Sequence, residues 1–372
     1  MFNPRRLAFA LDRRGLSKAA LADALGVTTR TISNYLAGIS EPNLQLLGRI
    51  LQFSPDFFII NDDLPILSDH QVSFRANSKT SNRLKRLALT YGIIAFMLND
   101  WFDERFELKK ADLPDLSDYS PETAAHVLRS EWGLGIRPIA NMVELLESKG
   151  IRVFSLAIEA IEVDAFCTWN RNIPFVFLNN KKSAERSRFD SAHELGHLVR
   201  DVYSMKHDLY SSNSNNDAEP FCECSVNDNR TIEKNANEFA SAFLMPKDAL
   251  LPFRNQSINS IEQLLKLKSV FGVSIAALAY RLYKLEIISE WTYTRVLSPQ
   301  IAKLGYRKKE PKPMRRDTSK VWPQLFNYLD EDKISITDIA NELNIDSNDI
   351  VDLTFGLVSN KPHSMYHLKL IK

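Results

Sequence analysis

Two histidines one helical turn apart are the residues whose spacing most clearly supports chemistry in this sequence. His193-Glu-Leu-Gly-His197 places both imidazoles on one face of a helix, where they can bind the same metal ion. Glu194 lies beside them and can take a proton from a bound water. The motif therefore predicts a zinc-dependent hydrolase. The alternative is a core helix that carries two histidines without a metal.

A catalytic zinc ion usually has three protein ligands and one open position. A helix expected downstream offers Glu233 as the third ligand. Asn237 lies on the same face and can orient a ligand through a hydrogen bond without binding the metal itself. Two alternatives remain. Glu238 lies about a quarter turn away on that helix, and Cys222 and Cys224 in a polar loop would instead form a closed structural site. Among these, the sequence favours Glu233.

The elements that must position these residues are mainly helical. Residues 75–150 have the apolar spacing of amphipathic helices. Three runs rich in β-branched and aromatic residues, 150–154, 165–169 and 174–178, predict a small antiparallel sheet. The Ser, Asn and Asp content of 203–230 predicts a long surface insert. We therefore expect an α+β fold that is mainly α.

The N-terminal sequence predicts two helices joined by a tight turn. Ser17 can cap the first helix, Gly26 can end it in the left-handed conformation, and Thr28 can cap the second. Several short polar or basic side chains would then face outward, suited to DNA bases and phosphates: Lys18, Thr28, Thr29, Arg30, Ser33 and Asn34. Residues 1–60 hold seven Lys and Arg against four Asp and Glu, a net charge of +3. We expect a DNA-binding domain here; the alternative is a plain helical hairpin.

Composition excludes several classes of protein. The 372 residues have a formal net charge of +1, so the chain is not a histone-like polycation and any nucleic-acid binding must be local. The three cysteines cannot form a disulfide framework and suit a reducing compartment. No apolar stretch approaches the roughly 18 residues that a membrane span needs. We expect a soluble, cytoplasmic protein.

The C-terminal sequence repeats the apolar frame of the N-terminal helix pair. Shifting residues 17–32 by 318 positions places Ser17 on Ser335, Leu21 on Ile339 and Ile32 on Ile350. The polar surface of this copy is acidic, which would repel phosphates. One hypothesis is a helix-turn-helix-like module that binds protein and docks on the basic N-terminal domain or the basic linker. The alternative is an unrelated small helical bundle.

The N-terminal motifs resemble a known family. Residues 16–44, including the Gly-x-x-x-Pro turn at Gly38, resemble the Cro-repressor-type (XRE) helix-turn-helix family. The sequence departs from the family at Leu36, where a glutamate is frequent. The resemblance implies binding to an operator in double-stranded DNA and a homodimer.

The central motifs resemble the ImmA/IrrE family of metallopeptidases. The resemblance rests on the histidine motif, the preceding Arg188-Phe-Asp, the strand over 175–179 and the segment over 233–246, and it extends over about residues 1–312. It implies a gluzincin-like HExxH fold that binds Zn²⁺. In that fold His193, His197 and Glu233 are the ligands, and Glu194 is the general base. The insert between His197 and Glu233 is longer than the family usually carries.

These patterns divide the sequence into four parts. We expect a helix-turn-helix domain over 1–65, a metallopeptidase domain over 66–290, a basic linker over 291–318 and an acidic helical module over 319–372. The combination predicts a transcription regulator that cuts a repressor-like partner, or itself, in prophage, stress or toxin-antitoxin-like control. The alternative is a regulator whose metal site is structural or ligand-sensing. Intact Glu194 favours the enzyme, since a structural site has no use for a base.

Overall fold

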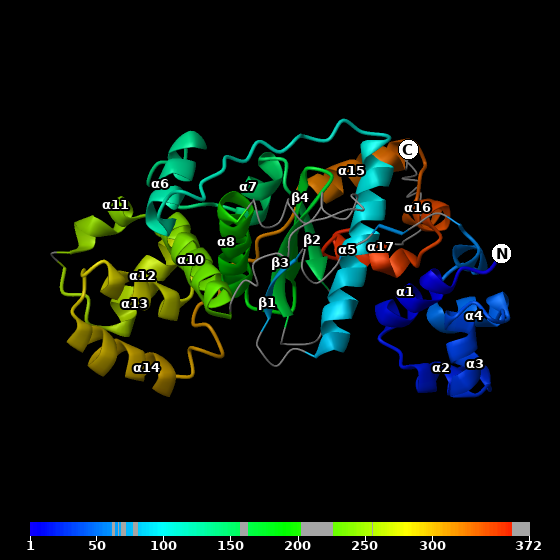
Figure 1. Ribbon diagram of the computed structural model, residues 1–372. Coiled ribbons are helices and arrows are strands. Elements are labelled where there is room, and N and C mark those ends of the chain that lie inside the picture. The colour runs from blue at the N-terminus through cyan, green and yellow to red at the C-terminus, as the bar shows by residue number, and fades with distance from the viewer. Residues whose placement is uncertain are drawn as a thin grey trace, which may run out of the picture.

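The computed structural model describes residues 1–61, 64, 65, 67, 72–76, 81–156, 163–201, 226–254 and 256–358. Most of the predicted insert, including Cys222 and Cys224, lies outside the described residues. The described part forms an α+β fold in which helices surround one small sheet (Figure 1). None of its helices is long and apolar enough to cross a membrane.

The N-terminal domain is a bundle of short helices. These are α1 (Pro4–Arg14), α2 (Lys18–Leu25), α3 (Thr29–Leu36), α4 (Leu44–Leu51) and the 3-10 helix η1 (Pro55–Phe58). The Ser17 side chain accepts a hydrogen bond from the Ala20 N–H and caps α2, and Thr28 caps α3 in the same way. Gly26, at φ 67°, ends α2 in the left-handed conformation. The predicted turn is therefore confirmed.

Within the described residues, the sheet has four strands in the order β1-β3-β4-β2. They are β1 (Ser73–Ala76), β2 (Arg152–Leu156), β3 (Val163–Asn170) and β4 (Ile173–Asn179). The β3–β4 pair is an antiparallel hairpin whose turn residues, Arg171 and Asn172, both have positive φ. However, β2 pairs in parallel with β4. The prediction of a wholly antiparallel sheet was wrong because β2 lies beyond β4 rather than beside β3, its neighbour in sequence.

The two faces of this sheet belong to different hydrophobic cores. Side chains alternate along a strand, so Cys167 and Val176 face one core while Phe166 and Phe177 face the other. The first core contains α8 (Ala184–Arg200) and α10 (Val226–Leu244). The second contains α5 (Asn82–Asp103), the N-terminal domain and the C-terminal helices. Figure 1 shows α8 and α5 on opposite sides of the strands.

Further helices extend the first core. They are α6 (Pro121–Glu131), α7 (Met142–Ser148), α11 (Lys247–Leu250), the 3-10 helix η3 (Leu251–Phe253), α12 (Ile261–Phe271) and α13 (Ile275–Lys284). A buried arginine, Arg129, ties α6 to α10 by donating to the Phe243 carbonyl at 2.5 Å. This layer holds α8 and α10 against the sheet.

The segment predicted as a linker, 291–318, is packed into the body of the protein. It begins with the π-helix η4 (Thr292–Leu297) and α14 (Ser298–Lys303), which bury Leu297 and Ile301. Near its end, the buried carboxylate of Asp317 receives two hydrogen bonds from Arg188 on α8, at 2.6 and 2.8 Å. The basic, proline-containing composition predicted a linker. The segment is instead anchored, because a buried arginine such as Arg188 is strongly unfavourable without a carboxylate to pair with it.

The C-terminal helices are α15 (Val321–Glu331), α16 (Ile336–Leu343) and α17 (Ser347–Leu353). Asn344, at φ 56°, ends α16 in the left-handed conformation, as Gly26 ends α2. This second helix pair packs against the N-terminal domain. Asp349 of α17 pairs with Arg13 at 2.6 Å and with Arg14 at 3.0 Å, both on α1. The expected docking on the basic N-terminal domain is therefore present.

The Arg13–Asp349 pair should contribute strongly to stability because both side chains are about 95% buried. Asp349→Ala would leave the Arg13 guanidinium buried without its carboxylate, and we expect a loss of about 3–5 kcal/mol in the free energy of unfolding. Urea denaturation of the full chain measures this. The control is Glu144→Ala, which breaks the exposed Lys320–Glu144 pair and should cost less than about 1 kcal/mol. Equal losses in the two variants would contradict the prediction.

Candidate metal centre

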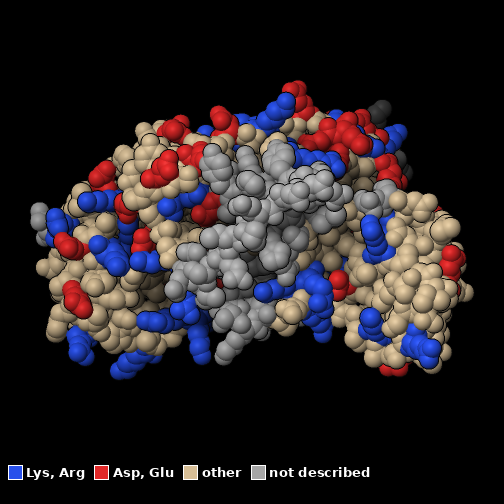
Figure 2. All heavy atoms as spheres, viewed as in Figure 1, with Lys and Arg blue, Asp and Glu red and all other residues tan. Residues whose placement is uncertain are grey.

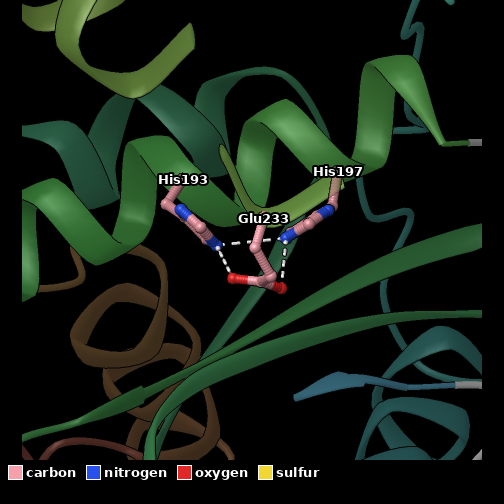
Figure 3. A group of neighbouring side chains, drawn as sticks. All are labelled: His193, His197 and Glu233. Carbon is pink, nitrogen blue, oxygen red and sulfur yellow. Dashed lines mark hydrogen bonds and ion pairs between the residues drawn. The ribbon is translucent and has the colours of Figure 1, made fainter. Parts of the chain in front are cut away.

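The two motif histidines lie on α8, a helix that Ser183 caps and that is buried along most of its length. His193 and His197 are both fully buried, and their Nε2 atoms lie 3.1 Å apart. Figure 3 shows both imidazoles leaving α8 on the same side. The i, i+4 spacing thus brings two metal-binding nitrogens together, as the sequence predicted.

The helix α10 brings the carboxylate of Glu233 to the same point. Its Oε2 lies 3.3 Å from His193 Nε2, and its Oε1 lies 3.5 Å from His197 Nε2 (Figure 3). The close approach of α10 to α8 depends on Gly196, where an added Cβ would lie only 3.0 Å from Phe239 Cδ1. A glycine within the motif therefore lets the third group reach the histidines.

The donor set and its spacing fit a divalent metal ion. Ligands about 2.0–2.1 Å from a tetrahedral ion stand about 3.3–3.4 Å from one another. The observed separations of 3.1, 3.3 and 3.5 Å lie around that value. Two imidazole nitrogens and one carboxylate leave a fourth position for a water or substrate. His193, His197 and Glu233 are therefore a possible metal-binding triad.

Asp201 is a residue that sequence reasoning missed. Its Oδ2 lies 2.6 Å from His197 Nδ1, on the far side of the ring from the triad. Burial lowers the pKa of His197, but hydrogen bonds with Asp201 and Glu233 outweigh it and raise that pKa to about 10. A bound metal would displace the proton from Nε2, while Asp201 fixes the ring orientation. The signal in the sequence was the spacing of four residues after His197.

The same histidines act on Glu233. Burial raises the pKa of its carboxyl, but hydrogen bonds with His193 and His197, and the charges on these rings, lower it well below the usual range. The carboxylate is therefore ionised over the whole physiological range. An ionised carboxylate is the form that binds a metal.

Glu194 is fully buried and lies over β3. It is next to the thiol of Cys167, whose pKa is raised first by burial and then by the charge of Glu194 and a hydrogen bond with it. The negative charge of Glu194 also raises the pKa of His197, which indicates that this carboxylate lies close to the triad. Its position is compatible with the predicted role as a base.

The remaining candidates near the site lie in different places. Asn237 Nδ2 donates to the backbone carbonyl of Glu233 at 2.7 Å, one turn earlier on α10. Glu238 is half-exposed and lies 3.9 Å from Lys234, away from the triad. Of the three alternatives for a third ligand, only Glu233 is near the histidines within the part of the chain that the structure describes.

The predicted DNA-contacting residues form an outward surface on α2 and α3. Lys18, Thr29, Arg30 and Ser33 are exposed, and Asn34 is partly exposed. Thr28 is also exposed, and its hydroxyl caps α3 by accepting a hydrogen bond from the Thr31 N–H at 3.2 Å. In Figure 1 these helices lie at the lower right of the molecule, with no other element below them.

Comparison with known proteins assigns both domains. Residues 7–53 match the helix-turn-helix family, and residues 146–283 match the IrrE N-terminal-like domain. The chain joins an XRE-type helix-turn-helix domain to an ImmA/IrrE-type domain. The first is a DNA-binding domain and the second a metallopeptidase-like domain, and the triad and Glu194 lie within the IrrE-like domain.

A solved structure, a Mycobacterium tuberculosis transcriptional regulator, is similar to the chain at 17% sequence identity and a TM-score of 0.30. The match covers 50% of this chain and 51% of that one, so this chain spans about half the length of its relative. None of the curated proteins matches the chain.

The contact between His197 and Asp201 predicts an effect on the affinity of the IrrE-like domain for metal. Asp201→Ala should weaken Zn²⁺ binding about 10–100-fold, because the ring loses the hydrogen bond that orients it. Titration against a chromophoric zinc chelator measures the dissociation constant. Asp248→Ala, on exposed α11, is the control and should leave it unchanged. An unchanged affinity in Asp201→Ala would show that this contact does not support a ligand.

Proposed function

We propose that the chain is a DNA-binding transcription regulator whose IrrE-like domain is a zinc-dependent peptidase acting on a repressor-like protein. The observation that carries the proposal is the triad of two buried histidines and the partly exposed Glu233, with buried Glu194 next to His193 on α8. Zn²⁺ is the proposed ion because imidazole and carboxylate donors at tetrahedral spacing suit it, and because three ligands leave one position open.

The residues of the chain divide the chemistry among them. When bound, Zn²⁺ would supply Lewis-acid polarisation of a peptide carbonyl and lower the pKa of a nearby water towards 7. Glu194 takes the proton from that water and passes it to the leaving amine. Asp201 holds the ring of His197 in orientation through the 2.6 Å contact with Nδ1.

Cleavage of a separate protein is favoured over self-cleavage in 306–318, the basic, proline-containing part of the segment that the sequence predicts as a linker. A peptidase needs an extended substrate segment that can enter its cleft. The end of 306–318 is instead held by the buried Arg188–Asp317 pair and by the Thr318 carbonyl, which accepts from Asn141 at 2.9 Å. A second segment whose cleavage would release the helix-turn-helix domain, 61–68, has half of its residues outside those that the structure describes.

A second candidate function is a metal-dependent switch of DNA binding without proteolysis. The observation that favours it is the packing between the two domains. Arg13 of α1 lies 3.8 Å above the ring of Tyr91 on α5, and α5 packs on the sheet that carries Glu194's neighbour Cys167. Strand β3 and helix α5 thus lie between the metal site and the helix-turn-helix domain, so a displacement of β3 on metal binding would reach α1 through α5.

Two variants separate these functions. Glu233→Ala should lose Zn²⁺, whereas Glu194→Gln should keep it, because only Glu233 supplies a ligand atom. Metal content is measured by mass spectrometry. If the domain is a peptidase, both variants should fail to cut a proteome-derived peptide library that the wild-type protein cuts. Zinc retained by the wild-type protein with no peptide cut would contradict the peptidase and support the switch.

The DNA-binding function is tested by selecting sequences from a random duplex library with the full chain. Arg30→Ala should weaken binding to the enriched sequence by about 1–3 kcal/mol and relax the preference at one base pair. The matched control is Lys247→Ala, an exposed cation on α11. Failure to enrich any sequence, or equal binding by the two variants, would contradict the assignment of α3 as the reading helix.

We also propose that two copies bind together, because helix-turn-helix domains commonly occupy paired half-sites. Enriched sequences should then hold two inverted half-sites about one helical turn apart. A single half-site would contradict the homodimer.

A further inference from the structure

The helix-turn-helix domain has less free positive charge than its sequence indicated. Arg6 is 2% exposed and lies 4.7 Å above the ring of Phe57. Arg13 and Arg14 both pair with Asp349 of α17. Three of the seven basic residues counted in 1–60 are therefore occupied within the protein.

The four remaining cations, Arg5, Lys18, Arg30 and Arg49, are exposed, but so are Asp23, Glu41 and Asp56. The surface of this domain is thus close to neutral. Contacts with phosphates supply most of the sequence-independent part of DNA affinity, and they require Lys and Arg. A DNA-binding chain of this kind needs further cations outside the helix-turn-helix domain.

A group of exposed cations lies at the end of α14 and in the stretch that follows it. We define the 303–315 surface by its six exposed basic residues: Lys303, Arg307, Lys308, Lys309, Lys312 and Arg315. Among the residues that the structure describes, none of these six forms an ion pair with a carboxylate. Arg307 donates to the Ser298 hydroxyl at 3.0 Å.

Glu310, within this surface, and Asp317, just after it, are both turned inward. Glu310 accepts from the Ile275 N–H at 2.7 Å and lies 3.7 Å from the buried Lys268. Asp317 is paired with Arg188. The fold therefore separates the charges of the stretch, with the carboxylates inside and the cations on the surface.

The 303–315 surface begins on the same edge of the molecule as the helix-turn-helix domain. Figure 1 places α14 and the pair α2 and α3 along the lower edge, with the first turn of α5 between them. That turn adds exposed Arg83 next to the α1–α2 turn, since a Cβ at Gly15 would lie 3.2 Å from Arg83 Nε. Figure 2 shows basic side chains spaced along this lower edge, while many acidic ones lie along the upper edge.

We propose that bound duplex DNA lies along this edge, with the helix-turn-helix domain contacting it at one end and the 303–315 surface contacting its phosphates at the other. This inference rests on the proposed DNA-binding function and adds a second, sequence-independent site to it. The backbone of DNA carries one negative charge per about 1.7 Å of helix axis, so a row of fixed cations can follow it without reading bases.

The test uses the sequence enriched by the full chain, prepared as a short duplex and as one with about 15 additional base pairs on each side. At 3.4 Å per phosphate along a strand, the flanks add about 50 Å in each direction. The variant is Lys308→Ala/Lys309→Ala. The matched control is Lys109→Ala/Lys110→Ala, which removes two exposed cations from the segment after α5, on the upper edge (Figure 1).

Fluorescence anisotropy over a range of salt concentrations gives the dissociation constants. We expect the variant to bind the long duplex about 10-fold more weakly and to reduce the slope of log K against log salt by about two, one for each phosphate contact. Binding to the short duplex, and both constants of the control, should change less than about twofold. Thermal unfolding of both variants should match the wild-type chain.

Other outcomes overturn the proposal. An equal loss on both duplexes, or no loss on either, would show that the surface does not contact flanking DNA. Loss of binding to phosphatidylserine vesicles, with unchanged binding to the long duplex, would assign the surface to lipid. If no sequence is enriched at all, the proposed DNA-binding function fails first, and this inference fails with it.

Discussion

The alternation of side chains along β3 and β4 is the constraint on which the rest of the structure depends. Because neighbouring residues point to opposite faces, the same two strands line both hydrophobic cores. Cys167 and Val176 face the helices that carry the candidate metal centre, and Phe166 and Phe177 face α5. A register shift of one residue would exchange the two faces and separate Glu194 from its neighbour on β3.

Buried charge pairs then close the chain around the sheet. Three such ion pairs are buried. Arg188 on α8 pairs with Asp317, and Lys268 on α12 pairs with Glu185 at 2.7 Å. Arg13 on α1 pairs with Asp349. Each pair joins residues more than 80 positions apart. A buried charge without its partner is strongly unfavourable, so such pairs favour one arrangement of the segments over others.

The C-terminal helix pair shows how one local backbone can serve two purposes. Its capping and left-handed turn repeat those of α2 and α3, but its acidic residues direct it to the protein's own arginines rather than to phosphates. The same contact removes two cations from the helix-turn-helix surface. Docking of the module therefore changes the charge that a bound DNA would meet, as well as the stability of the fold.

Local features of the site and fold followed from the sequence. The i, i+4 spacing of His193 and His197, the caps at Ser17 and Thr28, and the left-handed Gly26 depend on residues within a few positions of one another, where helix geometry decides the outcome. The choice of Glu233 over Glu238 was also within reach, because the two point in different directions on one helix.

Tertiary structure decided what depends on distant partners. Three contacts are of this kind: β2 pairs in parallel with β4, Asp317 anchors 291–318 to α8, and Asp349 pairs with Arg13. Each joins segments that are far apart in the sequence, so no local sequence pattern predicts it. Asp201 is an intermediate case. Its spacing of four residues from His197 was visible in the sequence, but its contact with Nδ1 depends on the orientation of the imidazole ring, which only the structure gives. The sequence by itself determined which groups could do chemistry. The packing of distant segments decided which charges are left to meet a ligand.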